Sequence, residues 1–178
     1  MMFEDLAIVG TESVKRGIPI VGKEKGLWLY EFIRDKQPKK VLELGTANGY
    51  SGCILGSQGA HLTTVEIDPI LAEEAQRNFK EYEINATVIV GDAVEIVHKI
   101  PLSEAFDVIF IDCAKRAYRK VLDVCIRLVR IEGYIVADNI TMDGCRDYKE
   151  AVLNNRLLET QLINIKDGLA CSKRIGGG

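Results

Sequence analysis

The sequence predicts an α/β fold, a doubly wound, mostly parallel seven-stranded sheet that ends in a C-terminal antiparallel hairpin. Three observations predict this fold. Five short apolar runs alternate with segments of helical periodicity, which is typical of parallel strands joined by crossover helices. The first run leads into a glycine-containing turn at 45–49. Near the C-terminus, an Asp-Gly pair between two β-rich runs indicates a hairpin.

The expected strands are short and apolar. The run FDVIFI at 106–111 is nearly continuous in apolar residues, as a strand buried on both faces must be. Parallel strands are expected at 41–44, 62–67, 86–90, 106–111 and 133–137, and two antiparallel strands are expected on either side of 166–168.

The helix signals lie before and between these runs. Asp68-Pro69 is typical of a helix start, because proline is tolerated in the first turn. Helices are expected from residue 23 to the stop at Pro38, at 50–58, from 69 onward, at 94–100, at 115–130 and at 143–154.

Length and composition fit one domain spanning 1–178. The chain has 47% apolar and 28% charged residues. Within it, 1–18 is expected to be a short N-terminal extension and 176–178 a flexible tail. The net charge of -3 gives no general attraction to nucleic acid. No apolar run approaches the ~20 residues that span a bilayer, so we expect a cytoplasmic protein with no membrane partner.

The cysteines and histidines exclude several kinds of site. The five cysteines form no C-x-x-C pair, which argues against a disulfide framework or a zinc site. Neither histidine, His61 nor His98, has a recognisable catalytic context. A Ser-His-Asp or Cys-His mechanism is therefore not expected.

Glycine or an acidic residue follows each parallel strand. These residues are Gly45, Glu66, Asp92, Asp112 and Asp138. Because the carboxyl ends of parallel strands share one edge of the sheet, and ligands bind there near the switch point, these residues predict a single site.

The first turn favours one cofactor over others. It reads Gly45-Thr46-Ala47-Asn48-Gly49, without the G-x-G-x-x-G of a dinucleotide fold, so an NAD-dependent oxidoreductase is disfavoured. The preceding acid, Glu43, opposes a pyrophosphate but suits a positively charged amino group and sulfonium. Glu66 is placed to accept hydrogen bonds from two ribose hydroxyls, and Asp92 and Ala93 to meet an adenine edge. Together these features indicate S-adenosylmethionine.

Two motifs carry a family resemblance. With ELGTANGYS at 43–51 and EIDP at 66–69, residues 19–175 resemble the class I methyltransferases, and within them the cation-dependent O-methyltransferases typified by catechol and caffeoyl-CoA O-methyltransferases. The resemblance implies that Val21, in IVGKEKG, supplies backbone contacts and that Ser51 holds the methionine carboxylate. The full expected cofactor-binding set is Val21, Glu43, Gly45, Thr46, Ala47, Gly49, Ser51, Glu66, Ile67, Asp92, Ala93 and Asp112.

A metal site is expected at the ends of the fourth and fifth strands. Asp112, Asp138 and Asn139 offer two carboxylates and an amide oxygen, a donor set that suits Mg²⁺ or another divalent cation better than zinc or copper. In the family, the matching residues bind the cation. The resemblance also makes Lys115 the base that takes the proton of the acceptor hydroxyl.

These residues predict a Mg²⁺-dependent O-methyltransferase that acts on a small, catechol-like acceptor. Two departures affect the acceptor: Cys113 and Ala114 replace the bulky His and Trp of the catechol branch, and no C-terminal Glu convincingly matches the acid that orients catechol.

Other functions and partners stay open at this point. A basic cluster, defined as Lys115, Arg116, Arg119 and Lys120, leaves transfer RNA hydroxyuridine as an alternative acceptor. A non-catalytic S-adenosylmethionine-binding protein is a further alternative. Family members often dimerise, and the sequence does not fix the oligomeric state.

Overall fold

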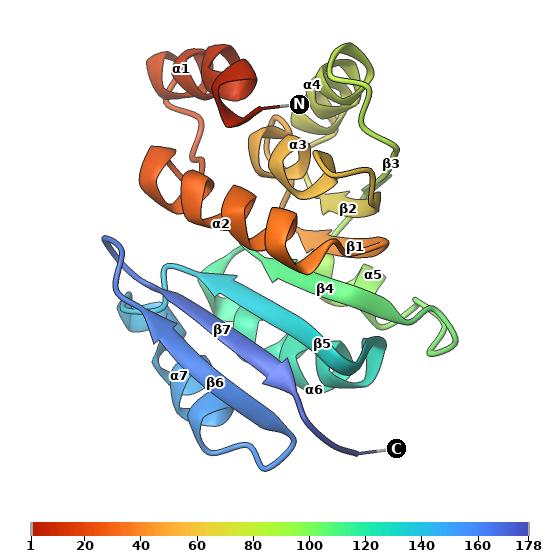
Figure 1. The fold of residues 1–178 in the computed structure, drawn as a ribbon, viewed down its shortest axis with the longest axis vertical. Coiled ribbons are helices and arrows are strands. Elements are labelled where there is room, and N and C mark those ends of the chain that lie inside the picture. The colour runs from red at the N-terminus through yellow and green to blue at the C-terminus, as the bar shows by residue number, and fades with distance from the viewer. Residues whose placement is uncertain (1, 178) are drawn as a thin grey trace.

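A computed structural model describes residues 2–177 and confirms the predicted α/β architecture (Figure 1). One seven-stranded sheet has the order β3-β2-β1-β4-β5-β7-β6. The first five strands pair in parallel, and β7 runs antiparallel to both of its neighbours. The strands are β1 (Lys40–Leu44), β2 (His61–Glu66), β3 (Ala86–Val90), β4 (Phe106–Ile111), β5 (Val129–Asp138), β6 (Leu158–Ile163) and β7 (Leu169–Arg174).

Helices cover both faces of the sheet. The α-helices are α1 (Ala7–Lys15), α2 (Lys23–Lys36), α3 (Tyr50–Gly56), α4 (Pro69–Glu81), α5 (Ala93–Val97), α6 (Tyr118–Leu128) and α7 (Arg146–Leu153), with single 3₁₀ turns at Phe3–Leu6, Lys115–Ala117 and Asp143–Cys145. In β4, Val108 and Phe110 pack into the layer of α2 and α3, whereas Ile109 and Ile111 pack into the layer of α6 and α7. This two-residue alternation explains why the strand must be apolar on both faces. In residues 2–177 there is no helix with the length and apolarity that crossing a membrane requires.

The predicted boundaries differ from the structure around α6. The helix expected at 115–130 begins with the 3₁₀ turn and ends at Leu128, and Val129 and Arg130 belong to β5. Val129 is buried and pairs with Phe106. Because its apolar side chain also continues the periodicity of the helix, the sequence pattern alone did not mark the end of α6.

The N-terminal segment is part of the core. Phe3, Leu6 and Val9 are buried in the same cluster as α3. A Cβ on Gly10 would lie 2.9 Å from the Tyr50 ring, so α1 packs directly against the start of α3. The segment predicted to be an extension therefore completes one helical layer. Of the predicted C-terminal tail, Gly178 lies outside the described residues, and the carbonyls of Gly176 and Gly177 accept hydrogen bonds from Arg174.

Glu43 is a fully buried acid within β1. Its carboxyl oxygens accept hydrogen bonds from Ser51 Oγ and Thr64 Oγ1, each at 2.6 Å. Burial raises the pKa of Glu43 to about 8, although these two hydrogen bonds act in the opposite direction. The carboxyl therefore keeps its proton to a higher pH than an ordinary Glu does.

Leu6→Ala should lower the free energy of unfolding by about 2–5 kcal/mol, because it removes a fully buried side chain from a packed layer. Ile8→Ala is the matched control, since Ile8 is 66% exposed on the same segment, and its effect should stay within about 0.5 kcal/mol. Urea denaturation measures both. Equal losses for the two variants would contradict the assignment of the segment to the core.

Glu43→Gln should change how stability depends on pH. The folded protein keeps a proton that an ordinary Glu, with a pKa of 4.5, releases, so Glu43 lowers stability progressively as pH rises from 4.5 to about 8. The difference in melting temperature between Glu43→Gln and the wild type should therefore grow, in favour of the variant, as pH rises across this window. Each kcal/mol of unfolding free energy that the wild type loses corresponds to roughly 2–4 °C. Parallel melting curves from pH 5 to pH 8 would refute the raised pKa.

Candidate functional site

A cavity of about 560 Å³ opens at the carboxyl ends of the parallel strands. This volume lies within the usual range for small-molecule sites. Most of the predicted site residues line its wall, namely Gly45, Thr46, Ala47, Ser51, Glu66, Ile67, Asp92, Ala93, Asp112, Lys115, Asp138 and Asn139. The structure thus brings the cofactor and metal candidates to one cavity.

Three predicted cofactor residues lie outside this wall. Val21 is buried in the core beside α2, and its neighbours Pro19 and Ile20 line the cavity instead. Glu43 lies behind the wall, bound to Ser51. A Cβ on Gly49 would lie 3.1 Å from Ala75 of α4. In the structure Glu43 supports Ser51 from behind the wall, and Gly49 allows the turn to pack closely against α4.

Gly45 joins the glycine turn to the end of β4. Its φ is +100°, and a Cβ there would lie 2.3 Å from the carbonyl oxygen of Asp112. No other residue type fits this contact without displacing backbone. The absence of a side chain therefore lets the first turn and Asp112 share one wall.

Glu66, the last residue of β2, is hydrogen-bonded to the turn that follows β1. Its Oε2 accepts hydrogen bonds from the backbone N–H groups of Thr46, at 3.1 Å, and Ala47, at 2.7 Å. Its Oε1 accepts one from Asp68 N–H at 3.0 Å. A carboxylate offers about four acceptor positions, so capacity remains for a ligand hydroxyl. Glu66 both shapes the turn and faces the cavity.

Both candidate metal-binding carboxylates have raised pKa values. Burial raises the pKa of Asp112 to about 6, with Lys115 opposing this shift and repulsion from Asp138 adding to it. Burial also raises the pKa of Asp138, and the hydrogen bond from Lys25 opposes that rise. Repulsion between neighbouring carboxylates, as between Asp138 and Asp112, favours a cation close to them.

The donor set fits a hard cation. In the described part of the chain no group of three or more His, Cys, Asp or Glu side chains has the arrangement of a metal site. The candidate set consists instead of the two carboxylates and the amide of Asn139, all on the cavity wall. A set of few oxygen ligands suits Mg²⁺, which usually keeps several waters.

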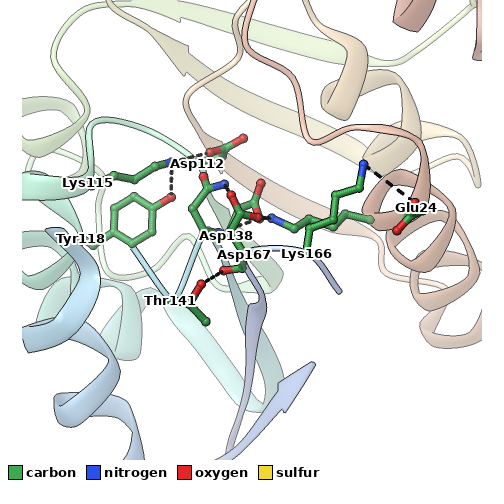
Figure 2. A network of polar contacts seen from close by, with 10 residues as sticks. Glu24, Asp112, Lys115, Tyr118, Asp138, Thr141, Lys166 and Asp167 are labelled. Atoms are coloured by element: carbon green, nitrogen blue, oxygen red, sulfur yellow. Dashed lines mark hydrogen bonds and ion pairs between the residues drawn. The ribbon is translucent and has the colours of Figure 1, made fainter. Parts of the chain in front are cut away.

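Lys115 is held at the edge of this donor set (Figure 2). Its Nζ donates to Asp112 Oδ1 at 2.9 Å and to the Tyr118 hydroxyl at 3.0 Å. Tyr118 is fully buried, and its ring packs edge-on against Tyr148 at 5.5 Å between centroids. The ammonium group is therefore positioned by a fixed tyrosine and one candidate ligand.

Two residues that the sequence did not single out belong to the site. Lys25, from the first turn of α2, forms ion pairs with Asp138 and Asp167. Asp167, in the turn between β6 and β7, also accepts a hydrogen bond from Asn139 Nδ2 at 2.7 Å. Lys25 lies within the IVGKEKG stretch, which is its one sequence signal, and the Asp-Gly pair at Asp167 indicates only a hairpin turn.

Two members of the basic cluster have acidic partners. Lys115 turns toward Asp112, and Arg119 pairs with Asp123 at 3.3 Å.

Burial raises the pKa of the Cys113 thiol to about 12, so this cysteine stays protonated and is a poor nucleophile.

Comparisons with known proteins agree with this geometry. The family model described as O-methyltransferase matches residues 3–176. The catechol O-methyltransferase of Niastella koreensis is 33% identical over 151 residues, covering 79% of this chain and 68% of that protein. The catechol O-methyltransferase of Bos taurus is 31% identical over 150 residues, covering 78% of this chain but only 55% of that protein. The chain thus spans little more than half the length of the bovine relative.

Solved structures share the fold. An O-methyltransferase from Streptomyces achromogenes, in complex with SAM, has a TM-score of 0.85 at 22% identity, with 96% of this chain and 89% of that chain covered. An O-methyltransferase from Bacillus cereus, in complex with SAH, has a TM-score of 0.83 at 22% identity, with 97% and 90% covered. Given the family match across residues 3–176 and relatives above 30% identity, the chain belongs to the O-methyltransferase family of S-adenosylmethionine-dependent enzymes.

Proposed function

We propose that this protein uses a divalent cation, most simply Mg²⁺, to transfer a methyl group from S-adenosylmethionine to a hydroxyl of a small, catechol-like acceptor. One observation carries the proposal. Asp112, Asp138, Asn139 and Lys115 line the same cavity as the glycine turn and Glu66. A cofactor site and a cation site in one cavity suit a reaction between a bound methyl donor and a cation-bound hydroxyl.

The cofactor would lie along the ends of β1, β2 and β3. Glu66 is assigned to the ribose, and Ile67, Asp92 and Ala93 to the adenine side. The turn at 45–49 and Ser51 are assigned to the methionine end. Ser51 Oγ donates its hydrogen to Glu43, so its lone pairs remain for a ligand that donates, such as the amino group of the methionine end. S-adenosylmethionine supplies the methyl group.

Asp112, Asp138 and Asn139 would hold the cation. A bound divalent cation lowers the pKa of a coordinated hydroxyl because it stabilises the oxyanion. Lys115 Nζ, fixed between Asp112 and Tyr118, is assigned to take the proton of the acceptor when it is in its neutral amine form. The remaining task of the protein is to position the acceptor oxygen against the methyl group.

The acceptor is inferred from the cavity and the relatives together. The Niastella koreensis and Bos taurus relatives, which match 79% and 78% of this chain, are catechol O-methyltransferases. A catechol presents two adjacent hydroxyls, which suits a cation held by only a few protein oxygens. Cys113 and Ala114 leave the cavity wall beside Asp112 without a bulky side chain. This wall would accept a substituted ring as readily as catechol itself.

Asp138→Ala should lower Mg²⁺-dependent methyl transfer at least about 100-fold, because it removes a cation ligand. Its affinity for S-adenosylmethionine should stay close to that of the wild type. The assay measures methyl transfer to catechol, to a CoA thioester of a hydroxylated aromatic acid and to bulk transfer RNA, with Mg²⁺ or with EDTA.

Asp123→Ala is the matched control, because the Asp123 side chain is 74% exposed on α6. Full wild-type activity in EDTA would refute cation dependence. Transfer to RNA but not to catechols would refute the small acceptor, and a lack of transfer to every acceptor would favour a non-catalytic binding protein.

Glu66→Ala should weaken S-adenosylmethionine binding by about 1.5–3 kcal/mol, because charge-assisted hydrogen bonds are lost. Glu66→Gln keeps an oxygen for the Thr46 and Ala47 N–H groups and should lose less. Calorimetry measures both, with Glu73→Ala, whose side chain is 71% exposed on α4, as the control. Unchanged affinity in Glu66→Ala would show that the ribose lies elsewhere.

A further inference from the structure

Lys25 is a buried cation beside the candidate metal ligands. Its side chain is 2% exposed, and its Nζ contacts carboxylates of both Asp138 and Asp167. A lysine this deeply buried needs such partners, because desolvation of an unpaired ammonium is very costly. Asp138 is also 2% exposed, so the Lys25–Asp138 pair is shielded from water on both sides. Its electrostatic effect on the neighbouring site is therefore weakly screened.

Asp167 links Lys25 to the third candidate ligand. One of its oxygens contacts Lys25, and the other accepts the hydrogen bond from Asn139 Nδ2. Asp138 and Asp167 lie side by side in the close view (Figure 2). Because the amide nitrogen of Asn139 donates to Asp167, the amide oxygen of Asn139 remains available as a cation ligand.

The turn that carries Asp167 is itself fixed to the end of β5. The carbonyl oxygen of Asp167 accepts hydrogen bonds from Thr141 N–H and Thr141 Oγ1, each at 3.0 Å. The carbonyl oxygen of Gly168 accepts one from Ile140 N–H at 3.3 Å. Asp167 is thus held in a defined place relative to Asn139, so it can orient the amide.

We infer that Lys25 and Asp167 are positioning residues of the cation site, and that the charge of Lys25 weakens divalent-cation binding by sharing Asp138 with the cation. Asp167 orients Asn139 and partly neutralises Lys25. The inference rests on the proposed cation dependence. It predicts a cation that exchanges readily, since a fixed ammonium on a ligand carboxylate opposes a second positive charge.

The direction in which two substitutions change the affinity for the cation separates this role from a merely structural one. Lys25→Met removes the competing charge and keeps an aliphatic side chain of similar length. Asp167→Asn leaves the charge of Lys25 less compensated but keeps an oxygen that can accept from Asn139. A purely structural pair would weaken cation binding in both variants.

The experiment is Mn²⁺ binding to the purified full-length protein without S-adenosylmethionine, measured from the electron paramagnetic resonance signal of free Mn²⁺. Lys25→Met should bind Mn²⁺ about tenfold or more tightly, a change of ~1.4 kcal/mol. Asp167→Asn should bind about threefold or more weakly, and Lys25→Arg, which keeps the charge, should stay within about threefold of the wild type. In metal-free buffer, Lys25→Met should melt at a lower temperature and recover when Mn²⁺ is added.

The outcomes distinguish this inference from the proposed function. If the wild type binds Mn²⁺, Asp138→Asn does not, and Lys25→Met binds no more tightly than the wild type, only the role of Lys25 is overturned. If no variant binds Mn²⁺, cation dependence is overturned with it. If Lys25→Met fails to fold, Asp167→Asn and Lys25→Arg decide the question, and unchanged or tighter binding in Asp167→Asn overturns the inference.

Discussion

The contact between Gly45 and Asp112 is the constraint on which the site depends. The ends of β1 and β4 meet there, with Asp112 N–H donating to Leu44 C=O at 2.9 Å and no room for a Cβ on Gly45. Because these strands are neighbours in the sheet, the glycine turn and the first candidate cation ligand occupy one wall. A cofactor on the turn and a cation on Asp112 would therefore lie close together without any movement of domains.

Buried ionisable groups are a second feature on which the site depends. Glu43 supports the turn from within β1, and Lys25 and Asp138 lie between α2 and the end of β5. Replacing buried ion pairs with apolar residues often leaves stability unchanged or improves it, so stability alone is a weak reason for their presence. A role in setting the geometry and charge of the site is a more economical explanation.

Much of the fold could be predicted from the sequence because its strands are locally encoded. The runs at 86–90 and 106–111 match β3 and β4 at both ends, and the Asp-Gly pair marked the turn of the hairpin. The residues at the strand ends could be placed on one edge because parallel strands fix that geometry. The end of α6 could not be predicted, since Val129 fits both a helix face and a strand.

The residues that lie behind the cavity wall and those that the sequence pattern missed have physical explanations. Glu43 shares a strand face with Val41, which packs in the layer of α2 and α3, so strand alternation points it toward Ser51. Lys25 and Asp167 are 142 positions apart in the chain, and a contact at that separation leaves no local pattern. The burial of Phe3 and Leu6 could not be predicted, because a four-residue 3₁₀ turn is too short for a hydrophobic periodicity to mark its buried face.

Crystals of the protein grown with S-adenosylmethionine and Mn²⁺ provide the most direct test, because the anomalous signal of manganese locates the cation independently of the protein atoms. The account predicts one strong anomalous peak bonded to oxygens of Asp112, Asp138 and Asn139, with the cofactor's methyl group directed toward the same part of the cavity. A cofactor bound there without a manganese peak, or manganese bound to other residues, would contradict it.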